Sequence, residues 1–140
     1  MSTSKHSKQL KPTFNDWYFM KSRDKLDKLW KNVSDTVDIM ITHGPPKYIL
    51  DLSENKEHKL EFCGDSALYK HVVYRIKPVL HCFGHIHNYK SIENSGVKKL
   101  MNCNTVFSNA AVVEDGKFGK ILGNGNMFKI DTESKKVVVL

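Results

Sequence analysis

Three histidines follow short apolar segments at positions where metal ligands are often found. Residues 80–83, Leu-His-Cys-Phe, can form a short strand, after which Gly84 is expected to permit backbone angles that other residues resist. His85 and His87 come next, with one residue between them. Side chains two apart in an extended chain point to the same side, so both imidazoles can face one point in space. Because imidazole is a common neutral metal ligand, the pair predicts part of a coordination shell.

A third histidine, His43, ends another segment with the composition of a buried strand. Residues 37–42 are mainly β-branched and apolar, and they run into the sequence His-Gly-Pro-Pro, whose turn-forming residues must end the strand. The chain from there to residue 80 is long enough for a crossover helix, which favours parallel pairing of the two strands. Ligands of open α/β sheets bind beyond the carboxyl ends of the strands. We therefore expect His43, His85 and His87 to converge at one edge of a sheet.

The remaining pattern predicts two helices and several short strands. Apolar residues at helical spacing indicate a helix over residues 22–33 that begins at Ser22. Asp65 or Ser66 can cap a second helix that runs to about residue 77. Residues 51–59 are polar and are expected to form a surface loop. Short strands are expected at residues 97–102, 105–108, 127–130 and 136–140, and their close spacing favours antiparallel pairing. The predicted fold class is α/β, a parallel strand-helix-strand unit followed by short antiparallel strands.

Length and charge fit one globular domain. The chain has 140 residues, and we expect residues 1–11 to form a mobile tail and residues 12–140 to form the domain. No apolar run approaches the roughly 20 residues that span a bilayer, and no secretion signal is present, so we expect a cytoplasmic protein without a membrane partner. The net charge is +7, but the lysines are scattered among acidic residues. A solvated surface explains this pattern, and binding of a polyanion stays open as an alternative.

The other potential ligands are expected to have structural roles. The cysteines are odd in number and widely spaced, which predicts free thiols rather than disulfides or a zinc site. His58 lies among charged residues and is expected to be exposed, while His71 falls in the second predicted helix and His81 in the strand before residue 84. The three cysteines are Cys63, Cys82 and Cys103.

The combination of these motifs resembles the C-terminal half of the calcineurin-like metallophosphoesterases, and within them the small brain-239-type metallophosphoesterase-domain proteins. The resemblance extends over residues 12–131, nearly all of this chain, and corresponds to about half of the family's domain. Its main motifs are Thr-His-Gly-Pro-Pro from Thr42 and Phe-Gly-His-Ile-His from Phe83, with support from the aromatic segment that starts at Pro12, from Trp30, and from Asn-Ala-Ala at Asn109.

This resemblance implies half of an α/β sandwich and a phosphoesterase that depends on divalent metal, which would be Mn, Fe, Zn or Mg. A metal pair lowers the pKa of bound water and neutralises charge during hydrolysis of a phosphodiester or phosphomonoester. By matching motifs, His43 and His85 would bind one metal and His87 the other. The implied substrate is a phosphoester, among which nucleotides are candidates. No catalytic residue besides the metal ligands is assigned.

The family's other ligand motifs are missing from the segment before His43. These are Asp-x-His, a Gly-Asp with the bridging carboxylate, and Gly-Asn-His. The sequence therefore predicts a truncated chain without the N-terminal ligands, and a single Zn or Ni on the three histidines is a less demanding alternative. A catalytically impaired descendant that binds metal or nucleotide, and a basic module for polyanions, also stay open. Half a sandwich would expose an apolar sheet face and edge, so we expect self-association or pairing with a missing N-terminal half.

Overall fold

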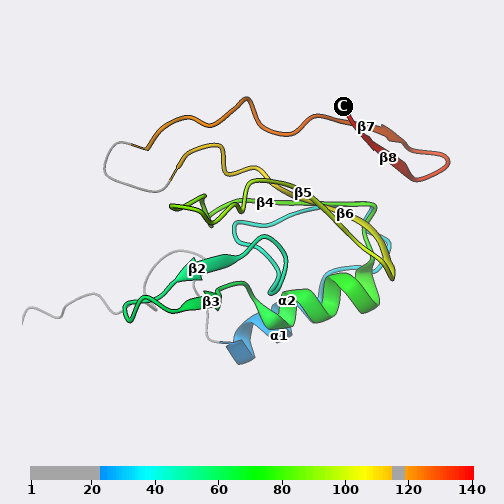
Figure 1. The fold of residues 1–140 in the computed structure, drawn as a ribbon. Helices are drawn as coiled ribbons and strands as arrows, with labels where there is room; N and C mark the ends of the chain where they lie inside the picture. Colours follow the sequence, from blue (N-terminus) through cyan, green and yellow to red (C-terminus); the bar gives the residue numbers. More distant parts are fainter. Residues whose placement is uncertain (1–22, 115–118) are drawn as a thin grey trace, which may run out of the picture.

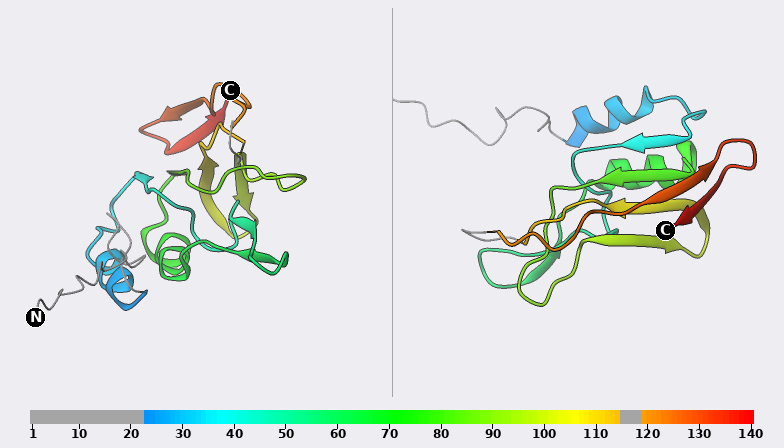
Figure 2. Two further views of the ribbon diagram at one scale, coloured as in Figure 1. Left: turned by 90° about the vertical axis from the view of Figure 1, so that its left-hand side faces the viewer. Right: turned by 90° about the horizontal axis from the view of Figure 1, so that it is seen from above.

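A four-stranded sheet with the order β1-β4-β6-β5 forms the centre of the structure, a computed structural model that describes residues 23–114 and 119–140 (Figure 1). Its strands are β1 (Ile39–Ile41), β4 (Leu80–Phe83), β5 (Gly96–Leu100) and β6 (Cys103–Asn109). β1 and β6 both pair with β4 in parallel, and β5 pairs with β6 antiparallel, as the strand directions in Figure 2 show. This confirms the α/β class, although β6 has one parallel neighbour where only antiparallel pairing was expected.

Two helices lie on one side of this sheet (Figure 1). The first, α1 (Arg23–Lys31), ends two residues before the predicted end, and the predicted cap at Ser22 lies outside the described residues. The second, α2 (Ser66–His71), continues as the π-helical turn η2 (Val72–Ile76). Asp65 caps α2 as predicted, because its Oδ1 accepts a hydrogen bond from the backbone N–H of Ala67 at 2.8 Å. β1, α2 and β4 thus form the predicted strand-helix-strand unit.

Arg75 joins the two helices through the end of α1. Its guanidinium donates to the backbone oxygens of Trp30 at 2.7 Å and Val33 at 2.8 Å. The oxygen of Trp30 also accepts from the N–H of Val33 at 3.1 Å, so Arg75 adds a second bond to the last turn of α1 and fixes the segment that follows it. The positive charge of Arg75 also interacts favourably with the negative C-terminal end of the helix dipole.

The hydrophobic core lies between the sheet and the second helix. Met40 of β1 is buried while its neighbours Ile39 and Ile41 are exposed, so one face of this strand turns to the helices. Phe83 and Phe107 extend the same layer across β4 and β6. They pack against five buried residues of the helical layer and the loop before it, namely Ile49, Leu68, Val72, Val73 and Ile76.

The loop predicted over residues 51–59 is present at residues 55–59, but residues 52–54 form a strand. Most of this segment belongs to a hairpin of β2 (Leu52–Glu54) and β3 (Leu60–Phe62), which pair antiparallel. The Asn55 side chain forms its turn by accepting hydrogen bonds from the N–H groups of Glu57 at 2.9 Å and Lys59 at 3.0 Å. The hairpin escaped sequence analysis because β3 is exposed and β2 only half-buried, so the apolar alternation of a half-buried strand is missing.

A C-terminal hairpin lies on the side of the sheet opposite the helices (Figure 1). It consists of β7 (Phe128–Asp131) and β8 (Lys136–Val139), which confirms two predicted strands. Lys135 in its turn forms an ion pair with Asp38 at 2.5 Å. β1 remains the edge strand of the sheet, and Ile41 on its outer face is 78% exposed.

Two further expectations concern cysteines and membranes. Cys63, Cys82 and Cys103 are free, as predicted. Among the described helices, none is long and apolar enough to cross a membrane. The predicted tail over residues 1–11 and the aromatic segment from Pro12 lie outside the described residues.

Candidate functional site

His43 and His85 meet at the carboxyl ends of the neighbouring parallel strands β1 and β4. The register pairs Ile41 with Cys82, and the ladder continues into the loops through a bond from the N–H of Gly84 to the oxygen of His43 at 3.0 Å. The two imidazole rings lie with their centroids 4.6 Å apart and their planes inclined by 44°. The predicted convergence of these two histidines is therefore present in the structure.

The backbone reason for this convergence differs from the one predicted. His85 adopts the left-handed conformation, with φ at +71°, whereas Gly84 does not. A Cβ at position 84 would meet the oxygen of His43 at 4.0 Å, which is an ordinary contact. The segment from His85 to His87 is thus a bent loop and not an extended strand. The expectation that side chains two residues apart point to the same side therefore does not apply to His85 and His87. A left-handed residue with a side chain carries strain that the surrounding structure must offset.

The environment of His85 favours the neutral imidazole. His85 is exposed by surface area, but partial desolvation of its ring lowers its pKa below the ordinary value, and the positive charges that His43 and His87 can carry lower this pKa further. Metal ions bind the neutral form of imidazole, so a lowered pKa keeps a ligand ready at neutral pH. The same interaction places His87, which is half-buried, within electrostatic range of the pair.

The three side chains do not form a closed ligand set as they lie. Within residues 23–114 and 119–140, no group of three His, Cys, Asp or Glu side chains is arranged to hold a metal ion. The rings of His43 and His85 pack against each other instead. The donor type and the position at the strand ends suit a divalent metal, but the described residues do not bring three such donors together.

Asp51, in the loop that follows His43, and Asp65, before α2, have structural partners. Asp51 is 1% exposed, and its Oδ2 accepts hydrogen bonds from the N–H groups of Tyr48 at 3.0 Å and Gly64 at 2.8 Å. Asp65 accepts from Trp30 Nε1 at 2.7 Å in addition to capping α2. Asp65 uses both carboxylate oxygens in these bonds, whereas Oδ1 of Asp51 is buried without a hydrogen-bond partner among the described residues.

His81 supports the His43 loop from beneath. The hydroxyl of Thr42 donates to the oxygen of Gly44 at 2.8 Å, so the 2.9 Å contact of this hydroxyl with His81 Nε2 requires the ring nitrogen to be the donor. His81 is fully buried, and burial lowers its pKa from 6.5 to about 4. It is a neutral structural residue, as the sequence predicted.

His71 and His58, the other two histidines among the described residues, also have structural surroundings. His71 is buried and contacts Asp27 at 3.1 Å, which fixes α2 to α1. His58 is exposed in the β2–β3 hairpin, where it pairs with Glu54.

Sequence analysis missed the buried amides behind the histidine loop. Asn94 and Asn109 are each 1% exposed. Asn109 donates a hydrogen bond to the backbone oxygen of residue 86, and Asn94 donates one to that of residue 87. Asn109 was noted only as part of the Asn-Ala-Ala motif. No local pattern marks Asn94, because two of its hydrogen bonds go to Leu52, 42 positions away in the sequence.

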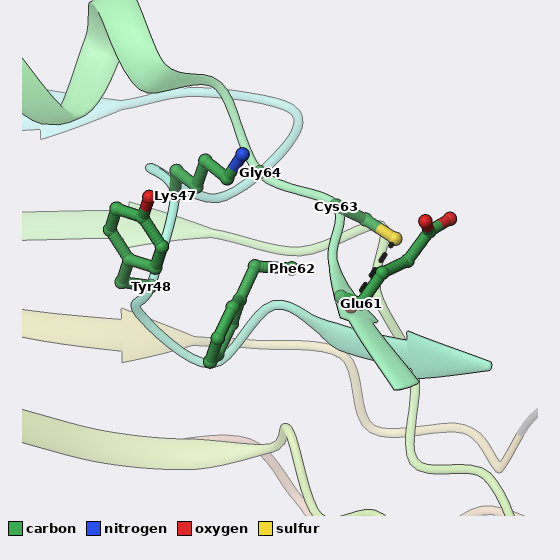
Figure 3. A pocket seen from close by; sticks show the side chains of 6 residues that line it. All are labelled: Lys47, Tyr48, Glu61, Phe62, Cys63 and Gly64. Carbon is green, nitrogen blue, oxygen red and sulfur yellow. Dashed lines mark hydrogen bonds between the residues drawn. The ribbon is translucent and has the colours of Figure 1, made fainter. Parts of the chain in front are cut away.

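A surface hollow of about 590 Å³ lies along the loop that follows His43 (Figure 3). Tyr48 and Phe62 form its aromatic wall, with ring centroids 5.1 Å apart in an edge-to-face arrangement. Lys47 Nζ lies 5.5 Å from the centre of the Tyr48 ring. The lining consists of Lys47, Tyr48, Glu61, Phe62, Cys63 and Gly64.

Comparison with known proteins relates the chain to a group of metallophosphoesterase-domain proteins. Human metallophosphoesterase domain-containing protein 1 is 36% identical over 92 residues, which is 65% of this chain and 27% of that protein. A UPF0046 protein of Caenorhabditis elegans is 34% identical over 94 residues, 66% of this chain and 22% of the relative. A second nematode UPF0046 protein is 36% identical over 99 residues, 71% of this chain and 30% of the relative. The matching part thus spans roughly a quarter of the length of these relatives. No family model matches the chain.

Proposed function

Since this chain belongs to the family of the metallophosphoesterase domain-containing proteins, we propose that it supplies the histidine ligands of a metal-dependent phosphoesterase. The proposed ligands are His43, His85 and His87, and the proposed substrates are phosphodiesters or phosphomonoesters, including nucleotides. The observation that carries the proposal is the pair of imidazoles, 4.6 Å apart, at the carboxyl ends of two parallel strands.

Each part of this site has a physical role in the proposal. Loops after parallel strands are where α/β proteins bind ligands, and a neutral His85 is ready to donate its lone pair. A bound divalent metal supplies Lewis acidity toward the phosphoryl group and lowers the pKa of bound water. The protein holds the loops of His43 and His85 together through the bond between Gly84 N–H and the oxygen of His43.

Metal titration of the purified chain tests the ligand assignment. We expect the chain to bind Zn²⁺ or Mn²⁺ and His85→Ala to lose this binding. His58→Ala is the control and should bind the metal unchanged, because His58 lies in the β2–β3 hairpin, where it pairs with Glu54. Retention of full affinity in His43→Ala, His85→Ala and His87→Ala would refute the assignment.

Turnover separates the proposed hydrolase from the second candidate function. The second candidate is a catalytically impaired descendant that binds metal or nucleotide. It is favoured because the described residues contain no closed group of three ligands. If the chain is a hydrolase, it should release nitrophenol from a nitrophenyl phosphodiester in the presence of Mn²⁺, and the His85→Ala variant should lose this activity. Metal or nucleotide binding without turnover, in a folded chain, supports the second candidate.

The exposed edge of the sheet supports a proposed interaction with a second chain. Ile39 is 47% and Ile41 78% exposed on β1, which has a hydrogen-bonded neighbour on one side only among the strands of residues 23–114 and 119–140. Apolar edge strands tend to pair with other chains. We therefore propose that this edge binds either a second copy of the chain or the remaining part of a metallophosphoesterase domain.

A further inference from the structure

We infer that Asn94 and Asn109 are positioning residues that fix the loop of His85 and His87 by holding two consecutive backbone carbonyls. The inference rests on the proposed function in that it concerns the same histidines. The side-chain hydrogen bonds of both asparagines go to backbone groups and not to an imidazole, so their effect on a bound metal would be indirect. They act on the backbone that carries the ligands.

Asn109, the last residue of β6, holds the carbonyl of Ile86. Its Nδ2 donates to Ile86 O at 2.9 Å and to Leu50 O at 3.3 Å, and its Oδ1 accepts from the N–H of Ala111 at 2.9 Å. Both donors of the amide are used, and the side chain is 1% exposed. Asn109 therefore fixes the histidine loop to the segment that follows the His43 loop.

Asn94 holds the next carbonyl, that of His87. Its Nδ2 donates to His87 O at 2.9 Å and to Leu52 O at 2.8 Å, while its Oδ1 accepts from the N–H of Leu52 at 3.0 Å. This side chain is also 1% exposed. Asn88 supports it from the other side, since Asn88 Oδ1 accepts from the N–H of Asn94 at 2.6 Å.

Together these bonds offset the strain of the loop between them. His85 is left-handed, and a loop held in such a conformation needs fixed points on its flanks. On one flank, the N–H of Gly84 donates a hydrogen bond to the oxygen of His43. On the other flank, the side-chain amides of Asn109 and Asn94 donate to the oxygens of residues 86 and 87. Three attachment points in four residues leave His85 little freedom to turn away from His43.

Asparagine is chemically suited to this task beside a cation site. An amide donates two hydrogen bonds to carbonyl oxygens without a charge that would repel or attract a metal ion. Aspartate has almost the same shape but no donor when it is ionised, so Asn→Asp removes the clamp at nearly constant volume. A buried carbonyl that loses its donor is left unsatisfied, and the loop is then expected to open toward water.

The test compares Asn94→Asp and Asn109→Asp with Asn126→Asp. Asn126 is the control because its amide also donates to oxygens beside the sheet, those of Gly96 at 3.2 Å, Ser108 at 2.9 Å and Asn109 at 3.1 Å, and it makes no hydrogen bond to residues 84–87 in the described structure. We expect Zn²⁺ affinity at pH 7 to fall about tenfold or more in the first two variants and to stay within about twofold in the control. Equal losses in all three variants would overturn the positioning role.

A measurement without metal keeps this inference separate from the proposed function. In the metal-free chain we expect amide hydrogen exchange of residues 84–87 to speed up, and the NMR cross-peak between the His43 and His85 rings to weaken, in the two clamp variants only. An unmutated chain that binds no Zn²⁺ defeats the proposed function, and the exchange data still decide the clamp. If both clamp variants fail to fold, Asn88→Ala removes the support of Asn94 without burying a charge. Unchanged exchange in that folded variant would overturn the inference.

Discussion

Lowering the pH is expected to destabilise the protein through His81, the buried neutral histidine beneath the His43 loop. Its ring lies against Phe83 and Phe107, with centroid distances of 5.2 and 5.9 Å. Nε2 donates to Thr42, and Nδ1 is buried without a hydrogen-bond partner among the described residues. A proton added to Nδ1 therefore finds neither water nor an acceptor, which is why burial lowers the pKa to about 4.

The sign and size of the effect follow from the two pKa values. In the unfolded chain His81 has its ordinary pKa of 6.5, and in the folded chain the pKa is about 4. Below pH 6.5 the unfolded chain takes up a proton that the folded chain does not, so the free energy of unfolding falls as the pH falls. At about 1.36 kcal/mol per pH unit, His81 lowers this free energy by about 2 kcal/mol at pH 5 and by about 3 kcal/mol near pH 4.

Urea unfolding at pH 8 and pH 5, followed by circular dichroism, measures this effect. His81→Gln keeps a donor for Thr42 and does not titrate, so its loss of stability between the two pH values should be about 2 kcal/mol smaller than that of the unmutated chain. His58→Gln is the matched control, because the His58 side chain is 84% exposed, and it should retain most of the original pH dependence. Equal pH dependence in the unmutated chain and His81→Gln would show that the pKa of His81 is the same in the folded and the unfolded chain, which would refute this reasoning.

Three further perturbations test the scaffold. Gly64→Ala should destabilise the chain by about 1–3 kcal/mol in urea unfolding, because a Cβ at this position would lie 2.7 Å from backbone atoms. Gly123→Ala is the control and should not destabilise the chain, because a Cβ there would meet no atom within 4 Å. Equal effects of the two substitutions would contradict this packing. Asp65→Ala should cost about 2 kcal/mol by removing a helix cap and the partner of Trp30, and a thermal transition that does not move would argue against the cap. Ile41→Lys should reduce self-association in sedimentation velocity, and an unmutated chain that stays monomeric at high concentration would remove the case for pairing of two copies at this edge.

Local patterns predicted the elements that carry the site. β-branched residues before His43 and an apolar run before Gly84 indicated two strands, and both strands are present. The cap at Asp65 was also predictable, since a carboxylate before a helix satisfies free N–H groups irrespective of the rest of the fold. By contrast, the β2–β3 hairpin was missed, because its stability depends on an Asn55 turn and on strand pairing rather than on burial.

The sequence by itself determined that histidines follow two strands of an α/β fold, because strand composition and turn residues act over a few neighbours. Only the tertiary structure decided that His43 lies 4.6 Å from His85, since this distance depends on the parallel register of β1 with β4. It also assigned the left-handed conformation to His85 and brought Asn94 and Asn109 against the loop. These contacts join residues up to 59 positions apart, as in the bond of Asn109 to Leu50, and such partners are selected by packing and hydrogen-bond satisfaction across the whole domain.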